Sequence, residues 1–372
     1  MPKQSGRTKV VLTGGHAATT AIATIEEVIR RERNWEIYWV GVKGAFAGRR
    51  KIPTLESSAI PAKGVVFRSI FAGRIQKKFT KWTIPSMLKI PIGFFHGLYL
   101  LATIRPKLVL SFGGFAAYPV VVAAWILRIP VIIHEQTSVV GRANRFSSFF
   151  AKKIAISRVS SARFFPKEKV VLTGNPLMTQ IWEVPTKKSP GVPLTLFFTG
   201  GSRGSRSLNL LMEGALETLL PKYIVIHQAG YLDFSRYQKI KEMLPESLSA
   251  NYELYPLLDP MQMDGVYRRA DIIIARAGAN TVAEIMAVKR PSILIPISLT
   301  AYDEQKKNAE SAVKFGIAEV LDENTAKSDD LVRLIEKISH DWKDIVSKII
   351  NKASGDMGAQ KKLVDLIEQC LK

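Results

Sequence analysis

Short runs of β-branched and aromatic residues alternate with longer amphipathic stretches along the whole chain. Alternation of this kind is typical of parallel sheets whose strands are joined by crossover helices. In the first half, the pattern predicts strands over residues 9–12, 36–40, 108–112, 130–134, 153–156 and 170–172. In the second half, it predicts strands over residues 194–199, 223–228, 252–255, 271–275 and 291–297. We therefore expect each half to form its own α/β, doubly wound, Rossmann-like sheet.

A proline-rich segment, residues 175–193, separates the two predicted sheets and interrupts regular structure. We therefore expect one domain over residues 1–175 and a second over residues 176–354. The tail, residues 358–371, has an amphipathic helical pattern, and we expect a helix over about 355–372 to pack back on the first domain. Two such domains facing a cleft would bind ligands beyond the carboxyl ends of their strands.

Composition agrees with two cytoplasmic domains. The chain has 372 residues, 47% of them hydrophobic, which is enough for two cores. Its one cysteine, Cys370, cannot form an intrachain disulfide, as expected in a reducing compartment. The longest apolar stretches, residues 90–104 and 119–127, are shorter than the roughly 20 residues of a spanning helix. No apolar signal core precedes the first strand.

The excess of positive charge is confined to the first half. Residues 1–175 contain 28 Lys and Arg against 7 Glu and no Asp, whereas the remainder holds 25 residues of each sign. Such a field attracts nucleic acid, an acidic membrane face or a phosphorylated substrate. The chain has no recognisable nucleic-acid-binding module, which disfavours the first of these partners.

Glycine-rich or polar loops follow four of the predicted strands, at residues 13–16, 113–118, 199–205 and 276–280. Glycine lets backbone N–H groups approach an anion, and a helix N-terminus adds about half a positive charge. Tight turns also use glycine for steric reasons alone, but four such loops, two in each half, favour phosphate binding. None matches the full G-x-G-x-x-G fingerprint or a P-loop, so dinucleotide-binding and P-loop ATPase functions are disfavoured.

Further motifs occur in a specific order along the chain. They are His134-Glu-Gln with Gly141 and Asn144-Arg145, Thr173-Gly-Asn-Pro, Gly200-Gly-Ser, Arg276-Ala-Gly-Ala-Asn-Thr-Val-Ala-Glu, Pro291-Ser-Ile-Leu-Ile-Pro and Asp303-Glu-Gln-Lys-Lys-Asn. This series resembles the MurG family, the UDP-N-acetylglucosamine transferases of peptidoglycan synthesis. The resemblance covers most of the chain, from Thr13 to Asn308, and the blocks at 276–284 and 303–308 are its most specific parts.

The resemblance implies a GT-B fold, with the acceptor bound by the first domain and the donor by the second. It implies an inverting transfer of GlcNAc from UDP-GlcNAc to the C4 hydroxyl of the muramyl sugar of lipid I, giving lipid II. It also implies a peripheral enzyme at the cytoplasmic face of the cell membrane, with no nucleic acid as partner. No cofactor or catalytic metal is expected, and the sequence has no D-x-D triplet.

On the donor side, the resemblance implies that Glu284 accepts the ribose hydroxyls of uridine, a role suited to a carboxylate. The alternative is a capping box that Glu284 forms with Thr281. Gln305 resembles the residue that reads the donor sugar, although a loop glutamine is often simply solvated. Ser202 would donate to a UDP phosphate, and it could equally cap a helix. The remaining predicted donor residues are Arg203, Gly278, Ala279 and Thr137.

On the acceptor side, His16 is the candidate base, because an imidazole titrates in the range needed to accept a hydroxyl proton. Its alternative is packing or capping. Glu135 is the only acid between Glu56 and Glu168, so it is either paired with a cation or an active-site group. His134 is predicted to be structural. The acceptor phosphates are assigned to Thr13, Gly14, Gly15, Gly113 and Gly114.

Residues 71–89 interleave apolar side chains with one arginine and four lysines. This pattern suits an interfacial segment on anionic lipid, and in the MurG family this region meets the membrane. The alternative is a solvated loop with ordinary core contacts.

Four positions depart from the family pattern. Val11 and Leu12 replace two glycines, Met178 replaces an arginine near the donor phosphates, Arg203 replaces a glutamine and Thr137 replaces an asparagine. These departures keep two other functions open: a GT-B transferase with a different lipid acceptor such as diacylglycerol, and a non-catalytic UDP-sugar-binding protein.

Overall fold

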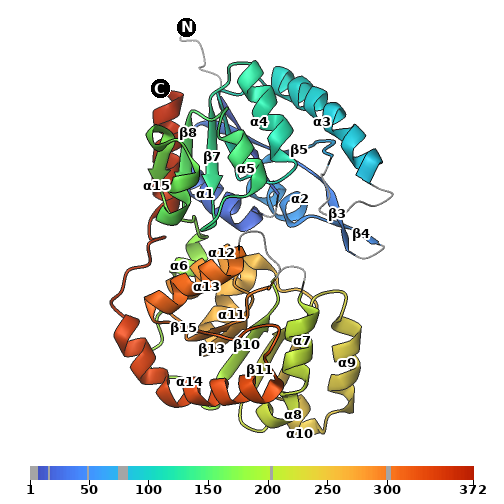
Figure 1. Cartoon of the computed structure of the whole chain (residues 1–372), viewed down its shortest axis with the longest axis vertical. Helices are drawn as coiled ribbons and strands as arrows, with labels where there is room; N and C mark the ends of the chain where they lie inside the picture. The colour runs from blue at the N-terminus through green and yellow to red at the C-terminus, as the bar shows by residue number, and fades with distance from the viewer. Residues whose placement is uncertain (1–6, 16, 48–49, 74–82, 202–203, 299–302) are drawn as a thin grey trace. The chain divides into compact units, whose positions relative to one another are not determined.

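The structure is a computed structural model that describes residues 7–15, 17–47, 50–73, 83–201, 204–298 and 303–372. It divides into two compact units, one of Met1–Met178 with Gly358–Lys372 and the other of Thr179–Met357 (Figure 1). The chain passes from the first unit to the second inside the proline-rich segment, and it returns to the first unit directly before the C-terminal helix.

The first unit contains a seven-stranded sheet in the order β5-β2-β1-β6-β7-β8-β9, in which all neighbours are parallel. Its strands are β1 (Thr8–Thr13), β2 (Trp35–Gly41), β5 (Val66–Ser69), β6 (Leu108–Ser111), β7 (Val131–Glu135), β8 (Lys153–Ile156) and β9 (Val170–Leu172). The chain adds β2 and β5 on one side of β1 and then returns to add β6 on the other side. The carboxyl ends of β1 and β6 therefore form the topological switch point, where open α/β sheets bind ligands.

The helices of this unit are α1 (Ala18–Arg30), α2 (Leu55–Ala59), α3 (Thr83–Ile104), α4 (Ala117–Ile126), α5 (Arg142–Ser147) and α15 (Ala359–Leu371). Short 3-10 segments span Pro61–Lys63, Val159–Phe164 and Lys167–Lys169. Helix α4 is apolar almost throughout because most of its residues are buried in the core beside the sheet. Within the described ranges, no helix is both long and apolar enough to cross a membrane.

The second unit contains a six-stranded parallel sheet in the order β12-β11-β10-β13-β14-β15. Its strands are β10 (Thr195–Thr199), β11 (Ile224–Gln228), β12 (Tyr252–Tyr255), β13 (Ile272–Ala275), β14 (Ser292–Leu294) and β15 (Ala318–Val320). Its helices are α6 (Thr179–Trp182), α7 (Arg206–Glu213), α8 (Leu216–Leu219), α9 (Phe234–Met243), α10 (Glu246–Ser249), α11 (Met263–Arg269), α12 (Ala279–Val288), α13 (Glu304–Phe315) and α14 (Ser328–Ile349), with a 3-10 turn at Pro260–Gln262. The predicted α/β class with two parallel sheets is confirmed.

The sequence pattern missed two short edge strands and a separate two-stranded sheet. Strand β5 has four residues and lies at a sheet edge with its side chains partly or fully exposed, so it lacks the apolar run of a central strand. Strand β15 has three residues and lies at an edge of the second unit's sheet. The antiparallel pair β3 (Gly44–Ala47) and β4 (Arg50–Pro53) forms a separate two-stranded sheet that was also not predicted.

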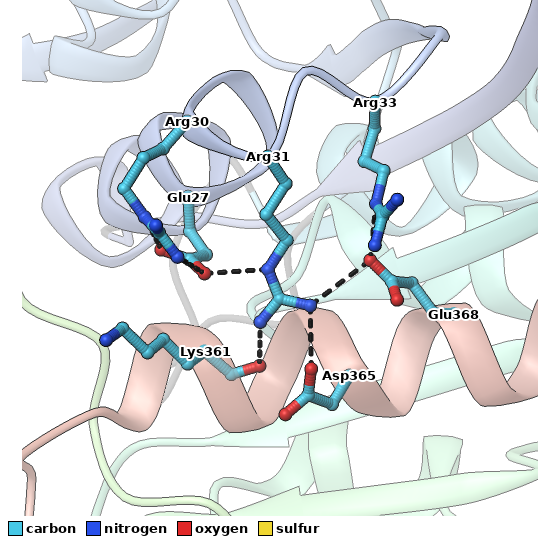
Figure 2. A network of polar contacts seen from close by, with 7 residues as sticks. All are labelled: Glu27, Arg30, Arg31, Arg33, Lys361, Asp365 and Glu368. Carbon is cyan, nitrogen blue, oxygen red and sulfur yellow. Dashed lines mark hydrogen bonds and ion pairs between the residues drawn. The ribbon is translucent and has the colours of Figure 1, made fainter.

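An arginine cluster fastens the C-terminal helix α15 to the end of α1 (Figure 2). Arg31 donates through Nε to Glu27 Oε1 at 2.7 Å and through Nη1 to Asp365 Oδ1 at 2.6 Å and Glu368 Oε1 at 3.2 Å. It also donates to the Lys361 carbonyl at 3.0 Å. Burial raises the pKa of the Glu27 carboxyl, but hydrogen bonds from the neighbouring arginines outweigh burial and hold that pKa below its ordinary value.

Replacing Arg31 with methionine should lower the free energy of unfolding of the first unit by about 2–4 kcal/mol, because Glu27 is almost fully buried and would lose a partner. Urea denaturation followed by circular dichroism measures this change. Arg33→Met is the matched control, since Arg33 is 44% exposed and forms one ion pair with Glu368, an interaction worth roughly 0–1 kcal/mol. Equal destabilisation by the two substitutions would show that the cluster does not fasten α15.

Candidate functional site

In the first unit, the two glycine loops at the switch point touch one another. The Gly15 N–H donates to the Gly113 carbonyl at 3.0 Å, and the Phe112 N–H donates to the Thr13 carbonyl at 2.8 Å. Gly114 has φ +90°, and a Cβ there would lie 3.0 Å from the Gly15 nitrogen. Glycine is required at this position both for its backbone conformation and for the close approach of the two loops.

Two predicted acceptor residues have clear structural roles in these loops. The buried Thr13 hydroxyl donates to the Val40 carbonyl at 2.8 Å and so braces the end of β1 against β2. A Cβ on Gly14 would lie 3.1 Å from the Phe112 Cβ, which is tight packing. His16, the candidate base, lies outside the described residues.

Glu135, at the end of β7, organises the loop that follows it. Its Oε1 accepts from the Thr137 N–H at 3.1 Å and the Thr137 hydroxyl at 2.9 Å, and its Oε2 accepts from Asn144 Nδ2 at 2.9 Å. Burial raises the pKa of the Glu135 carboxyl, and these hydrogen bonds oppose the rise. In the described part of the chain Glu135 has no ion pair with a cation, and its hydrogen-bond partners are Thr137 and Asn144.

Asn144 connects this loop to the glycine loop after β6, a role that the sequence did not reveal. Gly113 has φ +81°, and a Cβ there would lie 2.6 Å from Asn144 Oδ1. Asn144 thus occupies the space that a side chain at 113 would need. His134 is fully buried, and its Nε2 lies 3.1 Å from the Gly174 carbonyl oxygen, as expected for a structural residue.

In the second unit, strand β13 leads into helix α12, which carries the predicted uridine-binding residues. Gly278 is the N-cap of α12, with Ala279 as the first helical residue, and the cap has no side-chain hydrogen bond. The capping-box alternative for Thr281 and Glu284 is therefore wrong. Instead, Glu284 Oε2 accepts from the Tyr267 hydroxyl at 2.7 Å. Burial raises the pKa of the Glu284 carboxyl to about 7, although the bond from Tyr267 favours the ionised form.

The glycine loop after β10 adopts the left-handed conformation at Gly201 (φ +78°) and Gly204 (φ +72°). Gln228 stabilises this loop, because its Nε2 donates to the Gly201 carbonyl at 2.8 Å. The following helix α7 begins at Arg206 with Ser205 as its N-cap, so Ser202 is not the N-cap that the sequence suggested. Ser202 and Arg203 themselves lie outside the described residues.

Arg276 ties together the loops at the carboxyl edge of this sheet. Its Nε donates to Ser205 Oγ at 2.9 Å and its Nη1 donates to the Ile295 carbonyl at 2.8 Å, while Nη2 contacts Ser207 and Glu323. Burial alone would raise the pKa of Glu323, but hydrogen bonds from the hydroxyl, amide and guanidinium groups around it hold that pKa at about 2. The sequence placed Arg276 in a motif without predicting this bracing role.

Gln305 lies in the first turn of α13, where its Oε1 accepts from the Ile297 N–H at 3.0 Å. In the part of the chain that the structure describes, its amide nitrogen has no partner, and the side chain is only partly buried. Asn308, in the same motif, donates to the Ala277 carbonyl at 3.1 Å and fixes the turn before α12. Met178, which departs from the family arginine, is almost fully buried.

Comparison with known proteins gives matches across both units. The glycosyltransferase family 28 N-terminal domain matches residues 11–156, and the family 28 C-terminal domain matches residues 195–369. The chain is 33% identical over 350 residues to a Trichlorobacter lovleyi protein, covering 87% of this chain and 88% of the relative. That relative is named UDP-N-acetylglucosamine--N-acetylmuramyl-(pentapeptide) pyrophosphoryl-undecaprenol N-acetylglucosamine transferase. A Bacillus cereus protein with the same transferase name is 30% identical over 369 residues, covering 97% of each chain.

Solved structures agree in fold. Acinetobacter baumannii MurG has a TM-score of 0.69 at 23% identity and covers 97% of this chain and 99% of its own. The glycosyltransferase of kitacinnamycin has a TM-score of 0.71 at 16% identity, covering 98% of this chain and 99% of its own. Each unit thus has the α/β architecture of the GT-B fold. Family domains matched in both halves and relatives aligned over nearly their whole length place the chain in glycosyltransferase family 28, among the MurG transferases.

Proposed function

We propose that this protein transfers GlcNAc from UDP-GlcNAc to the C4 hydroxyl of the muramyl sugar of lipid I, giving lipid II in peptidoglycan synthesis. The observation that carries the proposal is the near-full-length similarity to transferases named for this reaction. The arrangement of Glu284, Gln305 and the glycine loop after β10 at one edge of the second sheet supports a nucleotide-sugar site there.

The donor side would act mainly through positioning and charge. Glu284 accepts hydrogen bonds from the ribose hydroxyls, and Gln305 contacts the sugar. The N-terminus of α12, at Gly278 and Ala279, and the backbone of the glycine loop stabilise the negative charge that develops on the departing UDP. Ser202 and Arg203 belong to the same loop and are assigned to the phosphates.

The acceptor side would use the switch-point loops of the first unit, whose residues Gly14, Gly15, Gly113 and Gly114 are assigned to the acceptor pyrophosphate. In these loops the Gly15 N–H donates to the Gly113 carbonyl and the Gly113 N–H donates to Ser111 Oγ. The acceptor oxygen attacks the anomeric carbon, the bond from that carbon to the UDP oxygen breaks, and the configuration inverts. His16 accepts the hydroxyl proton as general base. Glu135 acts as a positioning residue for the loop, since its oxygens are already bonded to Thr137 and Asn144.

The lipid that accepts the sugar distinguishes this function from the two alternative functions. Purified protein would be incubated with labelled UDP-GlcNAc and either lipid I or diacylglycerol, followed by extraction of the lipid products. Label in the lipid I product supports the proposal. Label in diacylglycerol supports a GT-B transferase of another pathway, and binding of UDP-GlcNAc without transfer to either lipid supports a non-catalytic protein.

We also propose that the first unit docks on the anionic cytoplasmic face of the cell membrane. Ile92, Phe95 and Tyr99 occupy one face of α3 and are 54%, 67% and 67% exposed. Phe71, 66% exposed, lies against this helix through a hydrogen bond from its N–H to His96 Nδ1 at 3.2 Å. Residues 74–82 of the predicted interfacial segment lie outside the described residues. Exposed apolar groups within a strongly basic unit favour lipid over nucleic acid as the partner.

Replacing Phe95 with aspartate should reduce partitioning onto vesicles of anionic phospholipid by about tenfold or more, because burying a phenyl group contributes about 1.5–3 kcal/mol. Cosedimentation with such vesicles measures the change. Val192→Asp is the control, since Val192 is 99% exposed but belongs to the second unit. Unchanged cosedimentation of the Phe95 variant would place the membrane contact elsewhere.

A further inference from the structure

Tyr267 is a buried tyrosine whose hydroxyl reaches the predicted ribose-binding carboxylate. It lies on α11, has 1% of its surface exposed, and donates to Glu284 Oε2 at 2.7 Å. Its ring meets the Phe197 ring edge to face, with centroids 6.1 Å apart and planes at 79°. Because Phe197 belongs to the central strand β10, the Tyr267 ring packs against the middle of the second sheet.

Glu284 depends on this one bond for its orientation. Tyr267 is its only hydrogen-bond partner among the described residues, and no cation there forms an ion pair with it. A glutamate side chain has several rotatable bonds, so without a partner its carboxylate would sample several rotamers. The phenol occupies one of the roughly four lone-pair sites of the carboxylate and leaves the others for a ligand.

We infer that Tyr267 is a positioning residue that fixes the Glu284 carboxylate for the two ribose hydroxyls of the donor nucleotide. This inference rests on the proposed function, because it takes the ligand of Glu284 to be a nucleoside diphosphate. Holding the acceptor group in place before binding removes the entropy cost of ordering it when the nucleotide arrives. Hydrogen bonding from Tyr267 also favours the charged carboxylate, which makes the stronger acceptor.

A purely structural role for the bond is the competing explanation, since a buried phenol needs a hydrogen-bond partner in any case. The two explanations differ in what they predict for the ribose. A structural role would weaken binding of all uridine nucleotides together. A positioning role would weaken only the binding that depends on the ribose hydroxyls.

The test compares UDP with 2′-deoxy-UDP by calorimetry on the full chain. The unmodified protein should bind UDP about 10–100-fold more tightly, the range expected for one hydrogen bond to a charged group. In Tyr267→Phe, this ratio should fall below about threefold, mainly because UDP binding weakens. The ratio of two dissociation constants is unaffected by any unfolded fraction of the variant, so lowered stability does not obscure the result.

Tyr237→Phe is the matched control. Tyr237 is equally buried in the second unit and also donates to a glutamate, Glu213, but it lies on α9. Its variant should lose stability and retain the full preference for UDP. A second check is the Glu284→Gln background, in which Tyr267→Phe should have little further effect on the ratio, as expected for coupled residues.

An undiminished ratio in Tyr267→Phe would overturn the inference while leaving the proposed function intact. Failure of the unmodified protein to bind UDP at all would instead overturn the proposed function. Equal losses of UDP and 2′-deoxy-UDP affinity would assign Tyr267 to structural support alone.

Discussion

Replacing Glu284 with glutamine should raise the KM for UDP-GlcNAc at least about 100-fold, because two hydrogen bonds from the ribose to a charged group are lost or weakened. The same substitution should make the free protein more stable at neutral pH. An ionised carboxylate at this partly buried position, with a single phenol as its partner among the described residues, is costly to desolvate. Glutamine keeps the acceptor for Tyr267 without carrying the charge.

The stability effect has a defined pH dependence. Burial raises the pKa of Glu284 to about 7, so the folded state holds this proton more tightly than the unfolded state does. The stabilising effect of proton binding is fully present below the unfolded pKa of about 4.5, and it is lost as the pH rises to 7. The advantage of Glu284→Gln should therefore be near zero at pH 4 and reach about 1–2 kcal/mol at pH 8, less than full linkage because the side chain is partly exposed.

Urea denaturation at the two pH values and steady-state kinetics measure these effects. Glu310→Gln, at an exposed position on α13, is the control and should change neither KM nor stability. A Glu284 variant that loses stability equally at both pH values would mean that the carboxylate supports the fold and is not held ready for a ligand.

Replacing Arg276 with methionine should have the second large effect, a loss of about 3–5 kcal/mol in the free energy of unfolding. Arg276 is 7% exposed and bonds to the loops at Ser205 and Ile295 and to Glu323, which would remain as a carboxylate without its cation. Because these loops belong to the proposed donor site, the KM for UDP-GlcNAc should also rise about tenfold or more. Denaturation and donor kinetics measure the two changes.

The double variant Arg276→Met with Glu323→Gln separates the lost ion pair from the lost packing, and it should recover part of the stability. Arg333→Met is the surface control, since Arg333 is 74% exposed in its pair with Asp330.

The pKa of Glu323 is lowered to about 2, so its contribution to the free energy of unfolding is present above the ordinary carboxyl pKa and is lost only as the pH falls toward 2. The deficit of the single variant should thus be constant between pH 5 and 8, and a deficit that varies over this range would contradict the assignment.

The sequence predicted features that are local in the chain. The central strands were predicted because parallel strands buried on both faces form continuous apolar runs. The glycine loops were predicted because glycine directly follows these strands, as Gly113 follows β6 and Gly201 follows β10. The short edge strands β5 and β15 were missed because their residues are partly exposed and form no such run.

The sequence could not predict which side chains would meet across the fold. Tyr267 precedes Glu284 by 17 positions and lies on a different helix, and Arg276 is 47 positions from Glu323. Nothing in the local pattern indicates either pair, and the local rule for Thr281 and Glu284 gave the wrong partner. Family resemblance predicted Glu284 as a site residue, whereas the tertiary structure revealed the hydrogen bond that it accepts from Tyr267.

The structure shows the surroundings of two of the departures from the family pattern, both in the first unit. Thr137, which replaces an asparagine, uses its hydroxyl within its own loop, on Glu135 and on the Val139 carbonyl. Met178 is buried, so the missing arginine is replaced by apolar packing. Both positions are ones that the family resemblance places on the donor side, so these two departures concern donor binding.

The most direct test of the central proposal is the product formed by the purified protein from UDP-GlcNAc and lipid I. We expect mass spectrometry to show lipid I extended by a single N-acetylhexosamine, and nuclear magnetic resonance to show that sugar β-linked to C4 of the muramyl residue. Retention of the α configuration, or recovery of unmodified lipid I while UDP-GlcNAc binds normally, would contradict the account.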